Sequence, residues 1–116
     1  MAVNTERTIS WVKAARKDFE AFPQAAQIEG ARALIVAGRG GKADNVKPMK
    51  GLGSGAMEIV IRHRGDAFRV IYAVQIGVDI WVVHAFQKKS TQGFKTPKHE
   101  IDLVKVRLKR LKEMLS

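Results

Sequence analysis

A chain of 116 residues with 46% hydrophobic residues is the size of one globular domain, so we expect residues 1–116 to form a single domain. The absence of cysteine excludes disulfides, thiolate metal sites and cysteine nucleophiles. With 21 Lys and Arg against 11 Asp and Glu, the formal net charge of +10 favours a polyanionic partner: a nucleic acid, a membrane surface or an acidic protein.

Residues 1–38 are expected to form a strand and two helices. Thr8–Val12 mixes β-branched and aromatic residues, which is typical of a short strand. Helical spacing follows over Lys13–Phe22, and Pro23 suits the first turn of a second helix that runs to Val36. The apolar residues on one stripe of this second helix are Ile28, Ala31 and Ile35.

The middle of the chain predicts a loop and then three strands. Residues 38–55 hold six of the ten glycines and four basic residues, which is typical of a long loop. The strands are Met57–His63, Phe68–Gln75 and Ile80–Phe86, joined by short turns that favour an antiparallel meander.

A last helix is expected from Thr96, as N-cap, to about Leu115, with Pro97 at its first position. Its apolar seam has five members, so we expect it to pack on the protein's own sheet: Ile101, Val104, Leu108, Leu111 and Leu115. The order strand-helix-helix-strand-strand-strand-helix predicts an α+β fold. It combines a small antiparallel sheet with an N-terminal helical hairpin and a C-terminal helix.

The sequence offers no recognisable metal or cofactor site. The three histidines lack paired spacing, and the glycine-rich segment 51–55 lacks the Lys-Ser/Thr ending of a phosphate-binding loop. We expect no metal and no cofactor. No stretch approaches the roughly 20 apolar residues that span a bilayer. Residues 1–7 contain no apolar signal core, so we expect a cytoplasmic protein without a membrane partner.

The excess of positive charge lies in two blocks of the sequence, with a net charge of +4 over residues 39–69 and of +6 over residues 87–116. If the blocks meet, they form a basic cleft. Arg69 interrupts an otherwise apolar strand, which costs free energy unless the charge meets water or a partner. The alternatives to a functional role are a solvated sheet face or a salt bridge to Glu58.

Alternation along the strands places several candidate residues together. His84, Phe86 and Lys88 share one face of their strand, and Arg62 lies on one face with Val60. If the uncovered faces coincide, the basic patch is formed by Arg62, Arg69, His84 and Lys88. His84 can equally be a satisfied core histidine, and Phe86 can equally be core rather than a platform for a base.

Four segments resemble the RelE/ParE toxin superfamily, especially its phage-derived, HigB-like branch. They are Glu58-Ile59-Val60-Ile61-Arg62-His63, Phe68-Arg69-Val70-Ile71-Tyr72, His84-Ala85-Phe86-Gln87-Lys88-Lys89-Ser90 and Lys95-Thr96-Pro97. The resemblance implies a type II toxin that cuts mRNA, commonly in the ribosomal A site and without metal. In that reaction the ribose 2′-hydroxyl attacks its own phosphate and leaves a 2′,3′-cyclic end.

The resemblance also implies roles for individual residues. Arg69 would grip the phosphate and Lys88 would stabilise the transition state or the leaving group. Arg62 and Lys50 fit the basic region only loosely. Val60 stands where many relatives have arginine, so one basic contact is missing, and no tyrosine follows Tyr72, so the base stays open. His84 is a candidate base, and the alternatives are His99 and a lysine whose pKa is lowered by neighbouring positive charge. The residues expected to bind RNA are Lys50, Phe86, Lys89, Lys105, Lys109 and Lys112.

The expected partners are mRNA, the ribosome and a cognate antitoxin with a helix-turn-helix domain, through which alone the toxin would reach operator DNA. Two other functions stay open. A ParE-like toxin would inhibit DNA gyrase without cutting RNA, and a third possibility is a non-catalytic nucleic-acid-binding module of the same fold.

Overall fold

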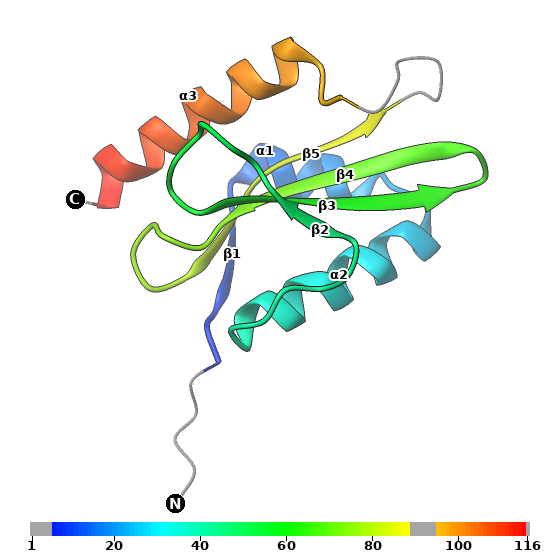
Figure 1. The fold of residues 1–116 in the computed structure, drawn as a ribbon, viewed down its shortest axis with the longest axis horizontal. Coiled ribbons are helices and arrows are strands. Elements are labelled where there is room, and N and C mark those ends of the chain that lie inside the picture. Colours follow the sequence, from blue (N-terminus) through cyan, green and yellow to red (C-terminus); the bar gives the residue numbers. More distant parts are fainter. Residues whose placement is uncertain (1–5, 89–94, 116) are drawn as a thin grey trace, which may run out of the picture.

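One mixed sheet with the strand order β1-β5-β4-β3-β2 organises the molecule. The computed structural model describes residues 6–88 and 95–115, and over those residues it has five strands and three helices (Figure 1). In chain order the elements are β1 (Ile9–Trp11), α1 (Lys13–Glu20), α2 (Gln24–Gly38), β2 (Val46–Pro48), β3 (Ala56–His63), β4 (Asp66–Ala73), β5 (Ile80–Lys88) and α3 (Lys98–Leu115). The expected α+β class, helical hairpin and C-terminal helix are confirmed.

The sheet differs from the expected antiparallel meander at both edges. β3, β4 and β5 pair antiparallel as expected, but β1 pairs parallel with β5. β2 adds an edge strand inside the expected loop, with Lys47 opposite Glu58 of β3. This strand has three residues including a proline, too few for a periodic signal, so only its pairing with β3 defines it.

α1 and α2 cover one face of the sheet, and the buried side of α2 is not its isoleucine stripe. Ile28 and Ile35 are 47% and 45% exposed, so the stripe expected from the sequence faces solvent. The buried side of α2 carries Leu34 and otherwise small residues, and a Cβ at Gly30 would lie 2.8 Å from Cε1 of Phe19 on α1 and 3.3 Å from Cδ1 of Ile61 on β3. The close approach of α2 selects glycine and alanine on its buried side, where large side chains would clash.

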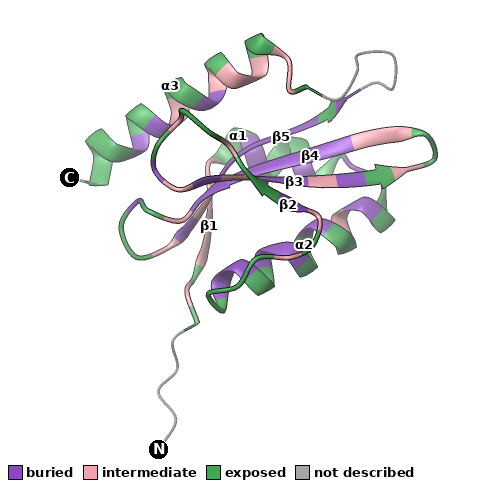
Figure 2. Ribbon diagram, in the orientation of Figure 1, coloured by how far each residue is buried: buried purple, intermediate pink, exposed green. Residues whose placement is uncertain are grey.

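α3 covers the opposite face, as expected from its apolar seam (Figures 1 and 2). Val104, Leu108 and Leu111 are buried against strands β4 and β5, whereas Leu115 is exposed. The expected cap is wrong by one residue, because the amides of Glu100 and Ile101 donate to the carbonyl of Pro97. The Thr96 hydroxyl does not cap the helix. It donates to Glu58 of β3 instead.

Candidate functional site

Strand pairing brings the predicted residues to one face of the sheet, the face that also carries α3. Cross-strand neighbours share a face, and the register gives three successive rows. The rows run Glu58–Ile71–His84, Val60–Arg69–Phe86 and Arg62–Ala67–Lys88. A register shift after Ile71 leaves Val83 as an extra residue and keeps His84 on this face. The four basic candidates therefore share one face: Arg69 and Lys88 belong to one group of contacts, His84 belongs to a second, and Arg62 belongs to neither.

The first group, which we call the Lys88 cluster, consists of Lys47, Glu58, Arg69 and Lys88. Oε1 of Glu58 lies 3.1 Å from Nη1 of Arg69 and 3.6 Å from Nζ of Lys47. The contact with Arg69 is ionic, since its angle does not make a hydrogen bond. Oε2 of Glu58 accepts the Thr96 hydroxyl at 2.7 Å. The salt bridge between Arg69 and Glu58, one of the alternatives open from the sequence, is present.

Lys88 is the unusual member of this cluster. It is 1% exposed, and its Nζ has no hydrogen-bond partner among the residues that the structure describes. Burial is the main cause that lowers the pKa of Lys88, and the charges of Arg69 and Lys47 lower it further against the opposing effect of Glu58. The ammonium lies near the molecular surface under a thin layer of atoms rather than deep in the core. A buried cation without a partner is a candidate anion-binding group.

The second group holds His84 between β5 and α3. Nη1 of Arg107 lies 3.0 Å from Nδ1 of His84, and Oε1 of Glu100 lies 3.1 Å from Nε2. Because arginine can only donate, Nδ1 accepts and Nε2 carries the hydrogen that is donated to Glu100. Burial is the main cause that lowers the pKa of His84, with Arg107 contributing and Glu100 opposing. His84 is thus neutral, with both ring nitrogens engaged in holding α3 to the sheet.

Phe86 separates the two groups. It lies opposite Arg69 in the register, is 8% exposed and belongs to the apolar cluster beneath α3. Its ring stacks on His84 with the centroids 5.1 Å apart. Little of the ring is left to meet a nucleobase.

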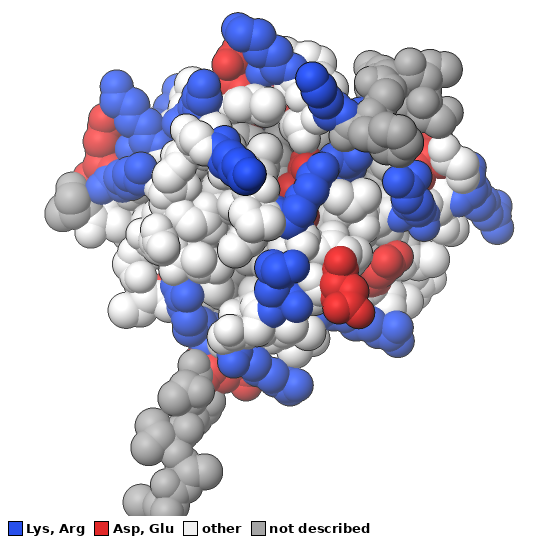
Figure 3. Space-filling model, in the orientation of Figure 1, with Lys and Arg blue, Asp and Glu red and all other residues white. Residues whose placement is uncertain are grey.

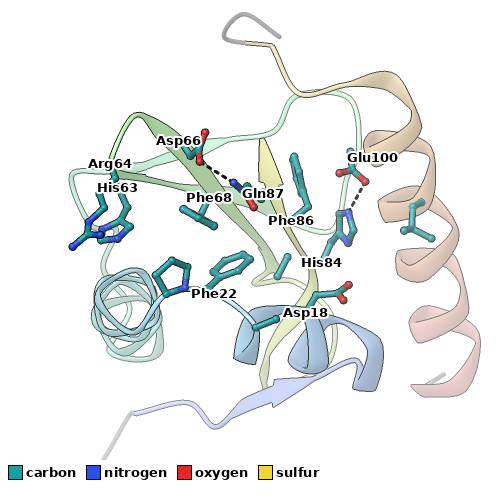
Figure 4. A pocket seen from close by; sticks show the side chains of 14 residues that line it. Asp18, Phe22, His63, Arg64, Asp66, Phe68, His84, Phe86, Gln87 and Glu100 are labelled. Atoms are coloured by element: carbon teal, nitrogen blue, oxygen red, sulfur yellow. Dashed lines mark hydrogen bonds and ion pairs between the residues drawn. The ribbon is translucent and has the colours of Figure 1, made fainter. Parts of the chain in front are cut away.

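A pocket of about 830 Å³ opens at the edge of β5 beside Phe86 (Figure 4). β1 pairs with β5 only as far as Val82, which leaves the later part of β5 paired with β4 alone among the described residues. Phe22, Phe68 and Phe86 give the pocket aromatic walls, and the carboxylates of Asp18 and Glu100 lie at its border. The Lys88 cluster is not part of its lining.

The remaining candidates lie at the surface or outside the described residues. Arg62 is exposed at the end of β3, and Lys50 is exposed in the turn after β2. Basic side chains outnumber acidic ones on the side of the molecule that Figure 3 shows, where β2 lies in front, α3 above and α2 below. Lys89 falls outside the described residues. The exposed lysines along α3 are Lys105, Lys109 and Lys112.

Sequence reasoning missed four participants of these two groups. Lys47 belongs to the short strand β2, and Thr96 was assigned to capping. Glu100 and Arg107 contact His84 from the polar side of α3, which periodicity alone marks as solvated. Within the described residues no group of three potential metal ligands lies together. No described helix is long and apolar enough to cross a bilayer.

The structure thus places the protein in the class of three-layer α+β proteins that carry a buried, cation-rich cluster on one face of the sheet. The chain belongs to the family described as phage derived protein Gp49-like (DUF891), whose model matches residues 17–109. This is a RelE-like family of toxins from toxin–antitoxin systems, and membership implies a cognate antitoxin as partner. No curated protein and no solved structure matches the chain.

Proposed function

We propose that this toxin is a ribosome-associated mRNA endoribonuclease of the HigB-like type that works without a metal ion. The observation that carries the proposal is the buried Nζ of Lys88, which has no partner among residues 6–88 and 95–115, beside the Arg69–Glu58 ion pair. Leaving a buried charge without a partner costs on the order of tens of kcal/mol at the ideal limit and still several kcal/mol in practice. A phosphodiester would supply the missing anion, and the thin cover over Lys88 leaves it a short way from solvent.

In the proposed reaction the 2′ oxygen forms a bond to phosphorus while the bond to the 5′ oxygen breaks. Arg69 binds a phosphate oxygen and stabilises the extra negative charge of the phosphorane-like transition state. The lowered pKa of Lys88 makes its ammonium a stronger acid, suited to donate a proton to the departing 5′ oxygen. The 2′-hydroxyl releases its proton to water. The products are a 2′,3′-cyclic phosphate and a 5′-hydroxyl end.

His84 and the exposed lysines have supporting roles in this proposal. With both ring nitrogens of His84 engaged, the side chain holds α3 over the site and the base role expected from the sequence is not assigned to it. The exposed lysines of α3 and Lys50 provide sequence-independent attraction to ribosomal and messenger RNA. The helix-turn-helix domain of the antitoxin remains part of the proposal.

Mapping RNA ends after induced expression tests the reaction. We expect mRNA fragments that end in 2′,3′-cyclic phosphate and begin with a 5′-hydroxyl, and we expect cleavage of free RNA at high toxin concentration to survive EDTA. Lys88→Met should abolish the fragments, whereas Arg16→Gln, which changes an exposed cation on α1, should leave them. Intact mRNA with blocked DNA supercoiling would instead identify a gyrase inhibitor, and neither effect would identify a non-catalytic module.

A further inference from the structure

A single carboxylate lies at the centre of the Lys88 cluster. Glu58 is 1% exposed, and its two oxygens contact three different elements: Arg69 on β4, Lys47 on β2 and Thr96 ahead of α3. A buried carboxylate in a site proposed to bind phosphate is unexpected, because it repels the phosphate that the site must hold. Neither the resemblance to the toxin family nor the proposed roles of Arg69 and Lys88 explain why a carboxylate is buried in this cluster.

We propose that Glu58 is a positioning residue of the phosphate site, which orients Arg69 for the reaction and at the same time weakens the binding of uncleaved RNA. The inference rests on the proposed function. Arg69 is held by Oε1 of Glu58 at 3.1 Å, while the Thr96 hydroxyl fixes the other carboxylate oxygen at 2.7 Å. The direction of the guanidinium therefore depends on a carboxylate that cannot rotate freely.

The opposing charge of Glu58 also serves catalysis. A site with three cations and no anion would bind the phosphodiester tightly before reaction, and ground-state binding of that kind does not accelerate the chemical step. With Glu58 present, its carboxylate and the phosphate of the bound RNA compete for the same cations. The cluster then favours the transition state, in which the phosphoryl oxygens carry additional negative charge, over the uncleaved substrate.

Glu58 also affects the pKa of Lys88, against the larger effect of burial. Among the described residues, the charges that act on the pKa of Lys88 are those of Arg69 on β4, Glu58 on β3 and Lys47 on β2, and Arg62 lies in the same row of the sheet as Lys88. Glu58 raises the pKa of Lys88, whereas Arg69 and Lys47 lower it. Since Lys88 acts as the protonated form, activity falls as pH rises through its pKa. Removing the charge of Glu58 moves this fall to lower pH, and removing the charge of Lys47 moves it to higher pH.

The test compares Glu58→Gln, Lys47→Gln and Thr96→Val with the wild type. For each we measure kcat on RNA, its pH dependence, and the affinity for a single-stranded oligonucleotide of 2′-deoxyribose, an analogue that lacks the attacking hydroxyl and cannot be cleaved. Glu58→Gln should bind the analogue several-fold more tightly, cleave RNA about tenfold or more slowly, and lose activity at lower pH. Lys47→Gln should bind more weakly and lose activity at higher pH. Thr96→Val, which changes no charge, should lower kcat with little change in affinity.

The outcomes separate this inference from the proposed function. If the wild type cleaves no RNA, the proposed function fails, and the opposite affinity changes of Glu58→Gln and Lys47→Gln still decide whether Glu58 opposes phosphate binding. Equal or weaker binding by folded Glu58→Gln overturns the inference, as does a pH shift of the same sign in both variants. Should circular dichroism show that Glu58→Gln does not fold, the exposed Lys47 decides the matter, because an unchanged affinity and pH profile in Lys47→Gln overturns the inference by itself.

Discussion

Replacing Lys88 by methionine should make the protein more stable while it removes activity. Methionine is an unbranched side chain one atom shorter than lysine, and it removes a buried ammonium that has no partner among the described residues. Exchanging buried charges for apolar groups of similar volume stabilises proteins by up to about 4 kcal/mol. The thin cover over Lys88 reduces the desolvation cost, so we expect a gain of about 1–2 kcal/mol. In a domain of this size the gain raises Tm by about 4–8 °C.

The gain should depend on pH in a defined direction. Burial and neighbouring cations hold the pKa of Lys88 below its ordinary value of 10.5. Below the lowered pKa the native and unfolded states both carry the proton, and the native state bears the full cost of the buried charge. Between the lowered pKa and 10.5 the native state loses the proton first, so the wild type becomes more stable as pH rises. The advantage of Lys88→Met is therefore largest at neutral pH and shrinks toward pH 10.5.

Thermal unfolding followed by circular dichroism at neutral and alkaline pH measures both effects, and a growth assay measures toxicity. Lys109→Met is the matched control, because it removes an exposed lysine of α3 and should change stability little at either pH. A Lys88→Met protein that is less stable than the wild type at neutral pH would refute the reasoning. So would a gain that stays constant up to alkaline pH, because the amine would then be paired or hydrated in the native protein.

Three further predictions concern other parts of the molecule. Arg69→Ala should abolish growth arrest through a loss of about 3–4 kcal/mol of transition-state stabilisation. It should also lower the free energy of unfolding by about 3–5 kcal/mol, because Glu58 stays buried. The double variant Arg69→Ala/Glu58→Ala should recover stability but not toxicity, and similar stability of the single and double variants in urea would contradict the ion pair. Gly30→Ala should cost about 1–3 kcal/mol in the same measurement, since the added Cβ would lie 2.8 Å from Phe19; an unchanged midpoint would show that the ring moves freely. Replacing Lys105, Lys109 and Lys112 of α3 by glutamine should weaken RNA binding evenly across RNA sequences. It should also flatten the salt dependence of binding by up to about one log–log unit per lost phosphate contact. An unchanged slope would show that this face of α3 is only solvated.

The elements of this fold could be predicted from local patterns because each pattern reports on one face of one element. The apolar seam of Val104, Leu108 and Leu111 predicted that α3 packs on the sheet, and it does. The same reasoning failed for α2, where Ile28 and Ile35 form the more hydrophobic stripe but face solvent. At α2 the close packing leaves room mainly for small side chains. A hydrophobicity scale contains no information about the distance between elements.

The sequence also placed the basic residues of the site on a common face, since alternation along β3, β4 and β5 holds wherever the strands pair in register. It could not determine their partners. Glu58 meets Lys47 through a strand too short to recognise, and it meets Thr96 through a contact between residues 38 positions apart. His84 is engaged by residues of α3 that lie 16 and 23 positions away.

Alternation and helical spacing are thus properties of single elements, and the sequence by itself determined the elements other than β2, the buried face of α3 and the sign of the charge on one face of the sheet. Only the tertiary structure decided the buried face of α2, which cation is paired, which is buried without a partner among the described residues and which atoms contact the two nitrogens of His84. Those features depend on how far water is excluded and on which side chains of distant segments come within hydrogen-bond or ion-pair distance. The proposed chemistry of Lys88 and Glu58 rests on these distances and on the exclusion of water, which arise when β2, β3, β5 and α3 come together.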